Sequence, residues 1–564
     1  MVDQLTSGHR SVFHRLPLSV LLPAAAAGTM VGTIMIAAHV TLLAAIGAGV
    51  AVTLLGTVRV RGRNIWRILG MRCALRWRKM RGNGIAAPAA PFDVPAPEAG
   101  GAVYGMRWDG GVLVTVLQVE PTGVAATLLA PTEIRTGDRV PLAEVVRCLS
   151  QFDIRLAAID VLALGVRSRG NHDAIRMYER MLGPLPATAT RTVWLALRFD
   201  PLDNAEAIGN RGGGTEGTVR TALVATRRVA NRLARHGVRS RVLTAAEIAA
   251  ADSTMLYGGA PEQWREEWDS LHGIDIEMTG YAVRPDRLNS EVLAGIWAVP
   301  GLSTLMRLRL APAVTRAGAR PSDERFEVTA LVRHDTLGGG TAAARKALTA
   351  LGLRPLTGVQ RQVLLNGEQH PDAAYGPAAT LQQLAVPAGG CGQVIGATAE
   401  GFGVAVPLFG PAVRRVEVVG SLRLAQQTTL RAAAIGARVI VHSTRPQDWE
   451  HMVTLVGVPE ALSVSSPGGG AQHTAAATLI VYDGVASTGQ VAEATVMHVR
   501  GPGELSAAIL GADVVLVESE EDQDEVHVRT ASGEWTVRVV SIPDELRYIG
   551  GADPAAAQQP LQPA

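Results

Sequence analysis

The chain has 564 residues, of which 47% are apolar and 18% charged, and Lys and Arg exceed Asp and Glu by only 53 − 51 = 2. This length accommodates two or more domains, and the near-neutral balance argues against a general nucleic-acid binder. The three cysteines, Cys73, Cys148 and Cys391, share no Cys-x-x-Cys spacing, which argues against a zinc site and fits a reducing compartment.

Residues 16–58 contain no Asp, Glu, Lys or Arg. They are too long for one membrane span, which needs about 20 residues. We therefore predict a transmembrane hairpin with helices at 17–37 and 40–58 and a turn near 37–39. A cleaved signal peptide would have a shorter apolar core and no second span, and two buried helices of a soluble domain would not be apolar on every side.

Positive charge flanks this stretch on both sides, and no acidic residue lies between Asp3 and Asp93. Basic residues stay on the cytoplasmic side, so the short tail at 1–15 and everything after the hairpin are expected to be cytoplasmic, at the inner membrane. Small residues recur one helical turn apart at Gly28 and Gly32 and at Ala45 and Gly49. These faces are candidates for close helix packing, either against another membrane protein or within the hairpin.

Residues 59–81 are predicted to form a basic juxtamembrane helix. Its apolar stripe consists of Trp66, Leu69, Cys73, Trp77 and Met80. Its other face carries a candidate collar for lipid or a partner, namely Arg67, Arg72, Arg76, Arg78 and Lys79. Such a helix suits an anionic membrane surface, and the alternative is packing on a soluble domain. A linker rich in Pro, Ala and Gly is predicted at 82–101.

The remaining chain predicts repeated strand–helix–strand units, hence an α/β fold. A β-hairpin is expected at 104–119, helices at 141–152 and 261–270, and a strand at 154–164. The first unit has a strand at 192–200, a Gly-rich loop at 212–214, a helix at 215–236 and a strand at 240–243. The second has a strand at 326–333 and a Gly-rich loop at 338–340, and the third runs from 416 to 442. We expect a first cytoplasmic domain at 102–258, a second at 259–545, and a disordered tail at 546–564.

Candidate chemistry is sparse. The Gly-rich loops precede helices, where backbone amides bind phosphate, but no Gly-Lys-Ser/Thr follows, so they are not P-loops. Asp200 and Asp203 follow a strand, without the Asp-x-Asp spacing of a metal site. The helix at 215–236 carries an arginine face, either solvated or docking onto acidic protein or lipid. We predict no catalytic, metal-binding or cofactor-binding residue.

Several segments together resemble the EccE family, a membrane component of the type VII (ESX) secretion system of actinobacteria. They are the N-terminal hairpin with its basic exit, Met-Arg-Trp-Asp-Gly at 106–110, residues 197–207, Arg-Gly-Gly-Gly-Thr-Glu-Gly at 211–217, residues 426–438, and Arg-Pro at 445–446 with Trp449. The resemblance covers residues 10–545 collectively. It implies a subunit of an inner-membrane complex with EccB, EccC and EccD, and it carries over no catalytic residue.

Two functions follow as hypotheses. The first is a structural, non-catalytic subunit of that secretion complex, supporting assembly and export, without nucleic-acid binding. The alternative is a membrane-anchored transferase acting on a nucleotide-sugar or lipid, which the α/β layering and the two aspartates near a strand end would allow. Fold alone does not decide between them, whereas converging carboxylates in a cleft would favour the enzyme.

Overall fold

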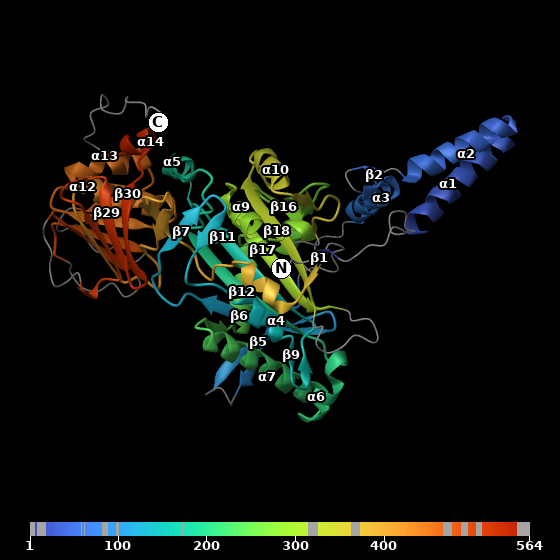
Figure 1. The fold of residues 1–564 in the computed structure, drawn as a ribbon, viewed down its shortest axis with the longest axis horizontal. Helices are drawn as coiled ribbons and strands as arrows, with labels where there is room; N and C mark the ends of the chain where they lie inside the picture. The colour runs from blue at the N-terminus through green and yellow to red at the C-terminus, as the bar shows by residue number, and fades with distance from the viewer. Residues whose placement is uncertain are drawn as a thin grey trace.

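The computed structural model describes residues 6–7, 18–57, 59–60, 63–81, 88–96, 101–170, 173–313, 325–361, 373–465, 477–486, 494–502 and 510–549. Figure 1 shows three parts in a row: a helical hairpin at one end, a central body, and a second body at the other end. The predictions for residues 8–15 and for the tail from 550 onward lie outside the described residues.

The hairpin consists of two apolar helices in contact along their length. They are α1 (Leu18–Ala37) and α2 (Leu42–Thr57), and the turn between them contains His39 at φ 58°, within the predicted turn. A short β-ribbon of β2 (Arg59–Val60) and β3 (Arg63–Asn64) leads to α3 (Ile65–Met80). Among the described residues, no helix is both long and apolar enough to cross a membrane, so the structure does not support the predicted spans.

The central body contains a βαββαβ unit with the strand order 4-1-3-2 of ferredoxin-like folds. Strand β13 pairs with β6, β6 with β12, and β12 with β11, all antiparallel. The elements in chain order are β6 (Val112–Glu120), α4 (Leu142–Arg147), β11 (Ala158–Val166), β12 (Thr190–Phe199), α7 (Gly214–Arg235) and β13 (Arg239–Val242).

The same topology occurs a second time in the central body. Strand β19 pairs with β16, β16 with β18, and β18 with β17, again antiparallel. The elements are β16 (Ile276–Val283), α9 (Ser290–Ala298), β17 (Ser303–Pro312), β18 (Phe326–Leu337), α10 (Thr341–Ala350) and β19 (Leu353–Pro355). Strands β11 and β17 pair and join the two units into one sheet. The expected boundary between residues 258 and 259 therefore falls inside a continuous sheet.

Additional strands extend this sheet at both ends. At one edge β4 (Phe92–Ala96) pairs with β5 (Ala102–Asp109), which forms the predicted hairpin with β6. Strand β4 lies inside the predicted linker, and Pro95 is tolerated there because an edge strand needs hydrogen bonds on one side only. At the other edge are β14 (Arg265–Glu266) and β15 (Leu271–His272), in place of the helix predicted at 261–270. The remaining small strands are β20 (Ala374–Gly376), which pairs with β18, and β1 (Thr6–Ser7), which pairs with β20.

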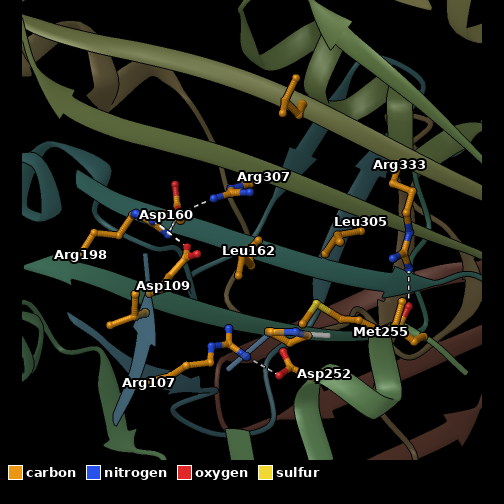
Figure 2. A pocket seen from close by; sticks show the side chains of 15 residues that line it. Arg107, Asp109, Asp160, Leu162, Arg198, Asp252, Met255, Leu305, Arg307 and Arg333 are labelled. Carbon is orange, nitrogen blue, oxygen red and sulfur yellow. Dashed lines mark hydrogen bonds and ion pairs between the residues drawn. The ribbon is translucent and has the colours of Figure 1, made fainter. Parts of the chain in front are cut away.

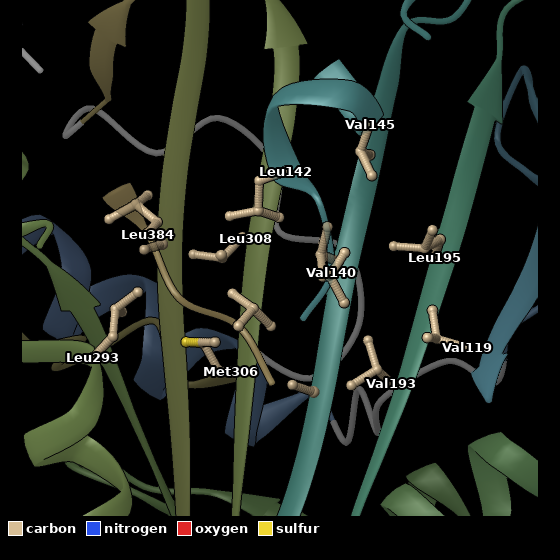
Figure 3. Close-up of a cluster of buried hydrophobic side chains, with 14 of the residues drawn as sticks. Val119, Val140, Leu142, Val145, Val193, Leu195, Leu293, Met306, Leu308 and Leu384 are labelled. Atoms are coloured by element: carbon tan, nitrogen blue, oxygen red, sulfur yellow. The ribbon is translucent and has the colours of Figure 1, made fainter. Parts of the chain in front are cut away.

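The core of the central body lies between the sheet and the helices on one of its faces. Figure 3 shows Leu142 and Val145 of α4 above the sheet, on the side where Leu195 of β12 and Leu308 of β17 point. Side chains alternate along each strand, so Leu117 faces this core while Val116 faces the opposite side. On that opposite side α8 (Ala245–Met255) packs against the sheet through a smaller apolar cluster. Thr244 and Glu247 form a capping box at the N-terminus of α8.

The second body is built on a mixed sheet. Six strands are parallel, in the order β25-β24-β26-β27-β23-β28, and the rest are antiparallel. The parallel strands are β23 (Arg415–Val419), β24 (Val439–Ser443), β25 (Leu462–Ser465), β26 (Leu479–Asp483), β27 (Thr495–Arg500) and β28 (Val514–Glu518). The unit predicted at 416–442 forms β23, α12 (Leu422–Ala434) and β24, but these strands pair with parallel neighbours, whereas every strand of the other two units pairs antiparallel, so it is no copy of them.

Two segments of the first half of the chain belong to the second body. Strands β7 (Thr127–Ala130) and β8 (Glu133–Arg135) complete its sheet by pairing β7 with β22. Helix α5 (Asp173–Leu182) packs there too, and its Tyr178 hydroxyl accepts a hydrogen bond from the Val394 amide at 3.1 Å. The antiparallel strands and remaining helices are β21 (Gln393–Ala397), β22 (Gly403–Val406), β29 (Glu525–Thr530), β30 (Gly533–Val539), α13 (Gln447–Val456) and α14 (Pro543–Leu546).

Candidate interaction sites

The four predicted packing residues face one another inside the hairpin. A Cβ atom built on Gly28 would lie 2.5 Å from the Gly49 carbonyl oxygen, and one on Gly49 would lie 2.8 Å from the Gly28 oxygen. One turn away, a Cβ on Gly32 would lie 3.4 Å from the oxygen of the fully buried Ala45. The small residues therefore let α1 and α2 approach closely, which is the second of the two packing alternatives.

The outer surface of the hairpin is apolar. Eleven of its described large apolar side chains are between 41% and 86% exposed, and Leu43 is the most exposed of them. The threonine hydroxyls do not add polarity to this surface, because they donate to backbone carbonyls of their own helices; Thr29 donates to Ala26 and Thr33 to Thr29. The most exposed members are Leu22, Met30, Ile34, Leu42, Leu43, Ile46, Val50, Leu54 and Leu55. A surface of this kind marks contact with a membrane or with protein.

The predicted basic collar on α3 is split between two environments. Arg78 forms an ion pair with Glu266 at 3.1 Å, and Lys79 forms one with Glu267 at 2.7 Å. The Arg72 guanidinium lies 5.1 Å from the centre of the Trp268 ring. These three residues therefore bind the end of β14 and the loop that follows it. Arg76 is exposed, and the Arg67 side chain lies outside the described part of the chain.

A cavity of about 120 Å³ lies on the side of the central sheet that carries α8. Figure 2 shows its apolar centre at Leu162 and Leu305, with arginines and aspartates around it. Arg198 contacts Asp109 at 2.7 Å, Arg333 donates to the Met255 carbonyl at 2.8 Å, and Arg107 pairs with Asp252. The cavity spans the pair β11–β17, and thus the junction of the two repeated units.

Asp160 is the most buried charge of this cavity, with a side chain 2% exposed. Arg307 and Arg309 bind its two oxygens at 2.6 and 2.7 Å. Burial alone would raise the pKa of Asp160, but the two guanidinium groups outweigh burial and hold that pKa well below its ordinary value. Its ion-pair partners lie on β12 and β17, and Arg198 of β12 also binds Asp109 of β5, so no local motif predicted this cluster. Each described lining carboxylate has an arginine partner, so the network joins the two units and α8.

The arginine face of α7 is also used within the protein. Arg232 binds Glu144 at 2.8 Å, and Arg228 donates to the Gln151 carbonyl at 3.0 Å. Arg239, just beyond the helix, donates to the Pro121 carbonyl at 2.7 Å. Arg235 is exposed. Three of these four arginines thus contact the central body itself and are not available for docking onto an external acidic partner.

The Gly-rich loops and nearby aspartates serve the backbone. Gly212, Gly213 and Gly214 have φ values of 101°, 69° and 57°, which side chains other than glycine rarely adopt, and they turn the chain from α6 (Ala205–Gly209) into α7. Asp200 accepts the Leu202 amide at 2.8 Å in a local turn. In the part of the chain that the structure describes, no three His, Cys, Asp or Glu side chains gather as a metal site.

The parallel sheet of the second body places the N-terminus of α12 directly after β23. In such sheets, ligands bind outside the carboxyl ends of the strands, often at a helix N-terminus. Here the Glu518 carboxylate occupies that position: the Ser421 hydroxyl donates to it at 2.8 Å, and the Ser421 amide donates to its other oxygen. A second carboxylate, Asp483, accepts Arg445 at 2.8 Å and the Trp449 indole at 2.9 Å at the same edge.

Comparison with known proteins identifies the class. Residues 187–283, which hold β12, α7 and β13, match the family described as "Putative type VII ESX secretion system translocon, EccE". The ESX-5 secretion system protein EccE5 of Mycobacterium marinum is 30% identical over 324 residues, which cover 54% of this chain and 78% of that protein. The ESX-1 secretion system protein EccE1 of Mycolicibacterium smegmatis is 28% identical over 401 residues, covering 69% and 75%. The ESX-1 protein EccE1 of Mycobacterium tuberculosis is 28% identical over 424 residues, covering 73% and 79%.

The chain therefore belongs to the EccE family of type VII ESX secretion proteins. The resemblance seen in the sequence is confirmed. The transferase alternative receives no support from these relatives.

Proposed function

We propose that this chain is a structural, non-catalytic subunit of the inner-membrane core complex of an ESX secretion system, with EccB, EccC and EccD as partners. Its family membership is the observation that carries this proposal. In this role the hairpin anchors the subunit, and the two bodies provide cytoplasmic surface for assembly. The chain then contributes to protein export by holding other subunits in place.

The membrane arrangement is part of the proposal. Helix α1 has 20 residues and α2 has 16, which correspond to lengths of about 30 and 24 Å. The shorter helix is accommodated by local thinning of the bilayer. The exposed apolar surface of the hairpin and its internally bonded hydroxyls support insertion, since a bilayer core leaves polar groups unsatisfied. Arginines beyond both ends favour cytoplasmic termini.

Three contacts support a role without catalysis. Glu518 fills the helix N-terminus where a phosphate would bind. Asp483 has both oxygens engaged by side chains of the protein. Asp200 caps a turn with one of its oxygens. Each carboxylate is thus placed to stabilise the fold.

Co-purification together with a secretion assay tests the proposal. Val50→Lys places a charge near the middle of α2 on the outer surface of the hairpin, where the side chain is 54% exposed, and a Lys at the centre of a spanning helix costs about 3 kcal/mol. This variant should leave the membrane complex, and secretion should fall in parallel. Asp200→Asn keeps the turn acceptor and should leave both unchanged. A complex that retains D200N in full yet no longer secretes would contradict the structural role.

A further inference from the structure

One face of helix α3 binds the central body, and the opposite face is exposed. The face toward the central body carries Arg72, Arg78 and Lys79, which contact Trp268, Glu266 and Glu267. Leu75, on the same face, is 7% exposed. In addition, the Arg78 guanidinium lies 3.5 Å from the Gly358 carbonyl oxygen. The basic residues thus hold the body rather than facing outward.

The opposite face of α3 is apolar and uncovered. Leu69, Cys73, Trp77 and Met80 follow one another at helical spacing and therefore lie on one side. Leu69 is 50% exposed, Trp77 51% and Met80 78%, and Cys73 is exposed as well. An apolar stripe of this kind on a helix whose other side binds protein is unusual for a monomer in water.

This stripe continues the apolar surface of the hairpin. Trp66, its first member, packs against α2 so closely that a Cβ on Gly56 would lie 3.1 Å from a carbon of the indole ring. Positive charge borders the stripe: Arg76 is exposed, and the Arg81 guanidinium lies 3.8 Å from the centre of the Trp77 ring. No acidic residue occurs between Asp3 and Asp93. Tryptophan and arginine at the edge of an apolar face are typical of helices in a membrane interface.

We propose that α3 lies in the interface of an anionic bilayer, with the stripe from Leu69 to Met80 against the boundary of headgroups and acyl chains. This inference rests on the proposed insertion of the hairpin. The lipid contacts then come from Arg76, an exposed member of the collar, and from Arg81 just beyond it. Arg72, Arg78 and Lys79 connect the helix to the central body. The body is thereby held at a fixed height and orientation above the membrane.

Cys73 offers a native reporter, because it is the exposed one of the three cysteines and the other two are buried. The full chain, with a nitroxide on Cys73, is placed in nanodiscs of phosphatidylcholine mixed with phosphatidylglycerol. Collisions with oxygen, which concentrates among acyl chains, should rise, and collisions with a water-soluble nickel chelate should be lost. As a matched control, Phe152→Cys in a Cys73→Ser background labels a site that is 96% exposed on the central body, and it should remain open to nickel.

The other outcomes overturn the inference in distinguishable ways. A label at Ile46→Cys in α2 reports insertion of the hairpin. Nickel access at Cys73 with oxygen access at Ile46 overturns the interfacial position of α3 and leaves the anchored subunit standing. Nickel access at both sites overturns membrane anchoring and the inference together. Shielding of Cys73 from both reagents shows a protein cover, and equal readings in discs of phosphatidylcholine alone overturn the role of anionic lipid.

Discussion

Close contact between α1 and α2 predicts a specific effect of Gly28→Ala. The new methyl group would meet the Thr53 hydroxyl and lie 2.5 Å from the Gly49 carbonyl oxygen, which belongs to backbone and cannot rotate away. The helices must therefore separate, and overpacking of this kind costs about 1–3 kcal/mol. Gly47→Ala is the matched control, since a Cβ there meets nothing within 4 Å. Both substitutions gain the same helix propensity.

The reaction rate of a buried thiol measures the difference. Ala45 lies in the contact with 0% exposure, so a cysteine placed there reacts only when the helices part. In the full chain with Cys73→Ser, in detergent, a destabilisation of 1–3 kcal/mol should speed labelling of that thiol by about 5- to 150-fold in G28A. The rate in G47A should match that of the parent or fall below it.

Equal labelling rates in G28A, G47A and the parent would refute the reasoning. That result would mean that the two helices are not held together through Gly28 and Gly49. A rise in both variants would point instead to a general effect of alanine on α1 and α2, and it would remove the close approach as the cause.

Three further predictions concern the ion pair that holds α3, the buried Asp160 and the three cysteine thiols. Glu266→Ala removes the ion pair with Arg78, which is expected to stabilise the docked helix by about 1 kcal/mol, so amide hydrogen exchange across α3 should become roughly fivefold faster. Unchanged exchange would show that the ion pair does not hold the helix. Asp160→Asn should lower the free energy of unfolding by about 3–5 kcal/mol. Because the folded state lowers the pKa of Asp160, the contribution of Asp160 to the free energy of unfolding is present above about pH 4 and is lost as pH falls. D160N should abolish this acid dependence, which urea unfolding at a series of pH values measures. Burial raises the pKa of Cys148 and Cys391 to about 11, so at pH 8 a thiol reagent should label Cys73 alone, and labelling of three thiols in the native chain would contradict their burial.

Local sequence signals predicted the elements whose stability is local. The turn at 37–39 followed from the length of the uncharged stretch at 16–58. The hairpin from β5 to β6 and the strand–helix–strand segments around α7 and α10 were visible as apolar periodicity broken by glycine. The likeness of the units at 192–243 and 326–354 corresponds to equivalent elements of two ferredoxin-like units. Their common sheet was not predicted, because the pairing of β11 with β17 leaves no local pattern.

The errors came from contacts with distant segments. Residues 92–96 were interpreted as part of a linker because residues 82–101 are rich in Pro, Ala and Gly, yet they form an edge strand, in which Pro95 is tolerated. Helix α3 and its stripe were predicted, but the side that binds protein was decided by Glu266 and Glu267, nearly two hundred residues away. The salt bridges around Asp160 likewise join four strands, β5, β11, β12 and β17. Sequence periodicity carries no information on such partners.

Strands β7 and β8 belong to the sheet of the second body although they precede most of the central body in the sequence, and this affects when that sheet can form during synthesis. These strands leave the ribosome early, yet β22, with which β7 pairs, begins at Gly403. During synthesis the edge of β7 therefore has no partner, and unpaired edges are sites of aggregation. Pairings so distant in sequence also slow folding, because a long loop must close first. A nascent chain that stops before Gly403 is therefore expected to expose this edge, and the sheet of the second body is completed only after β22 has been synthesised.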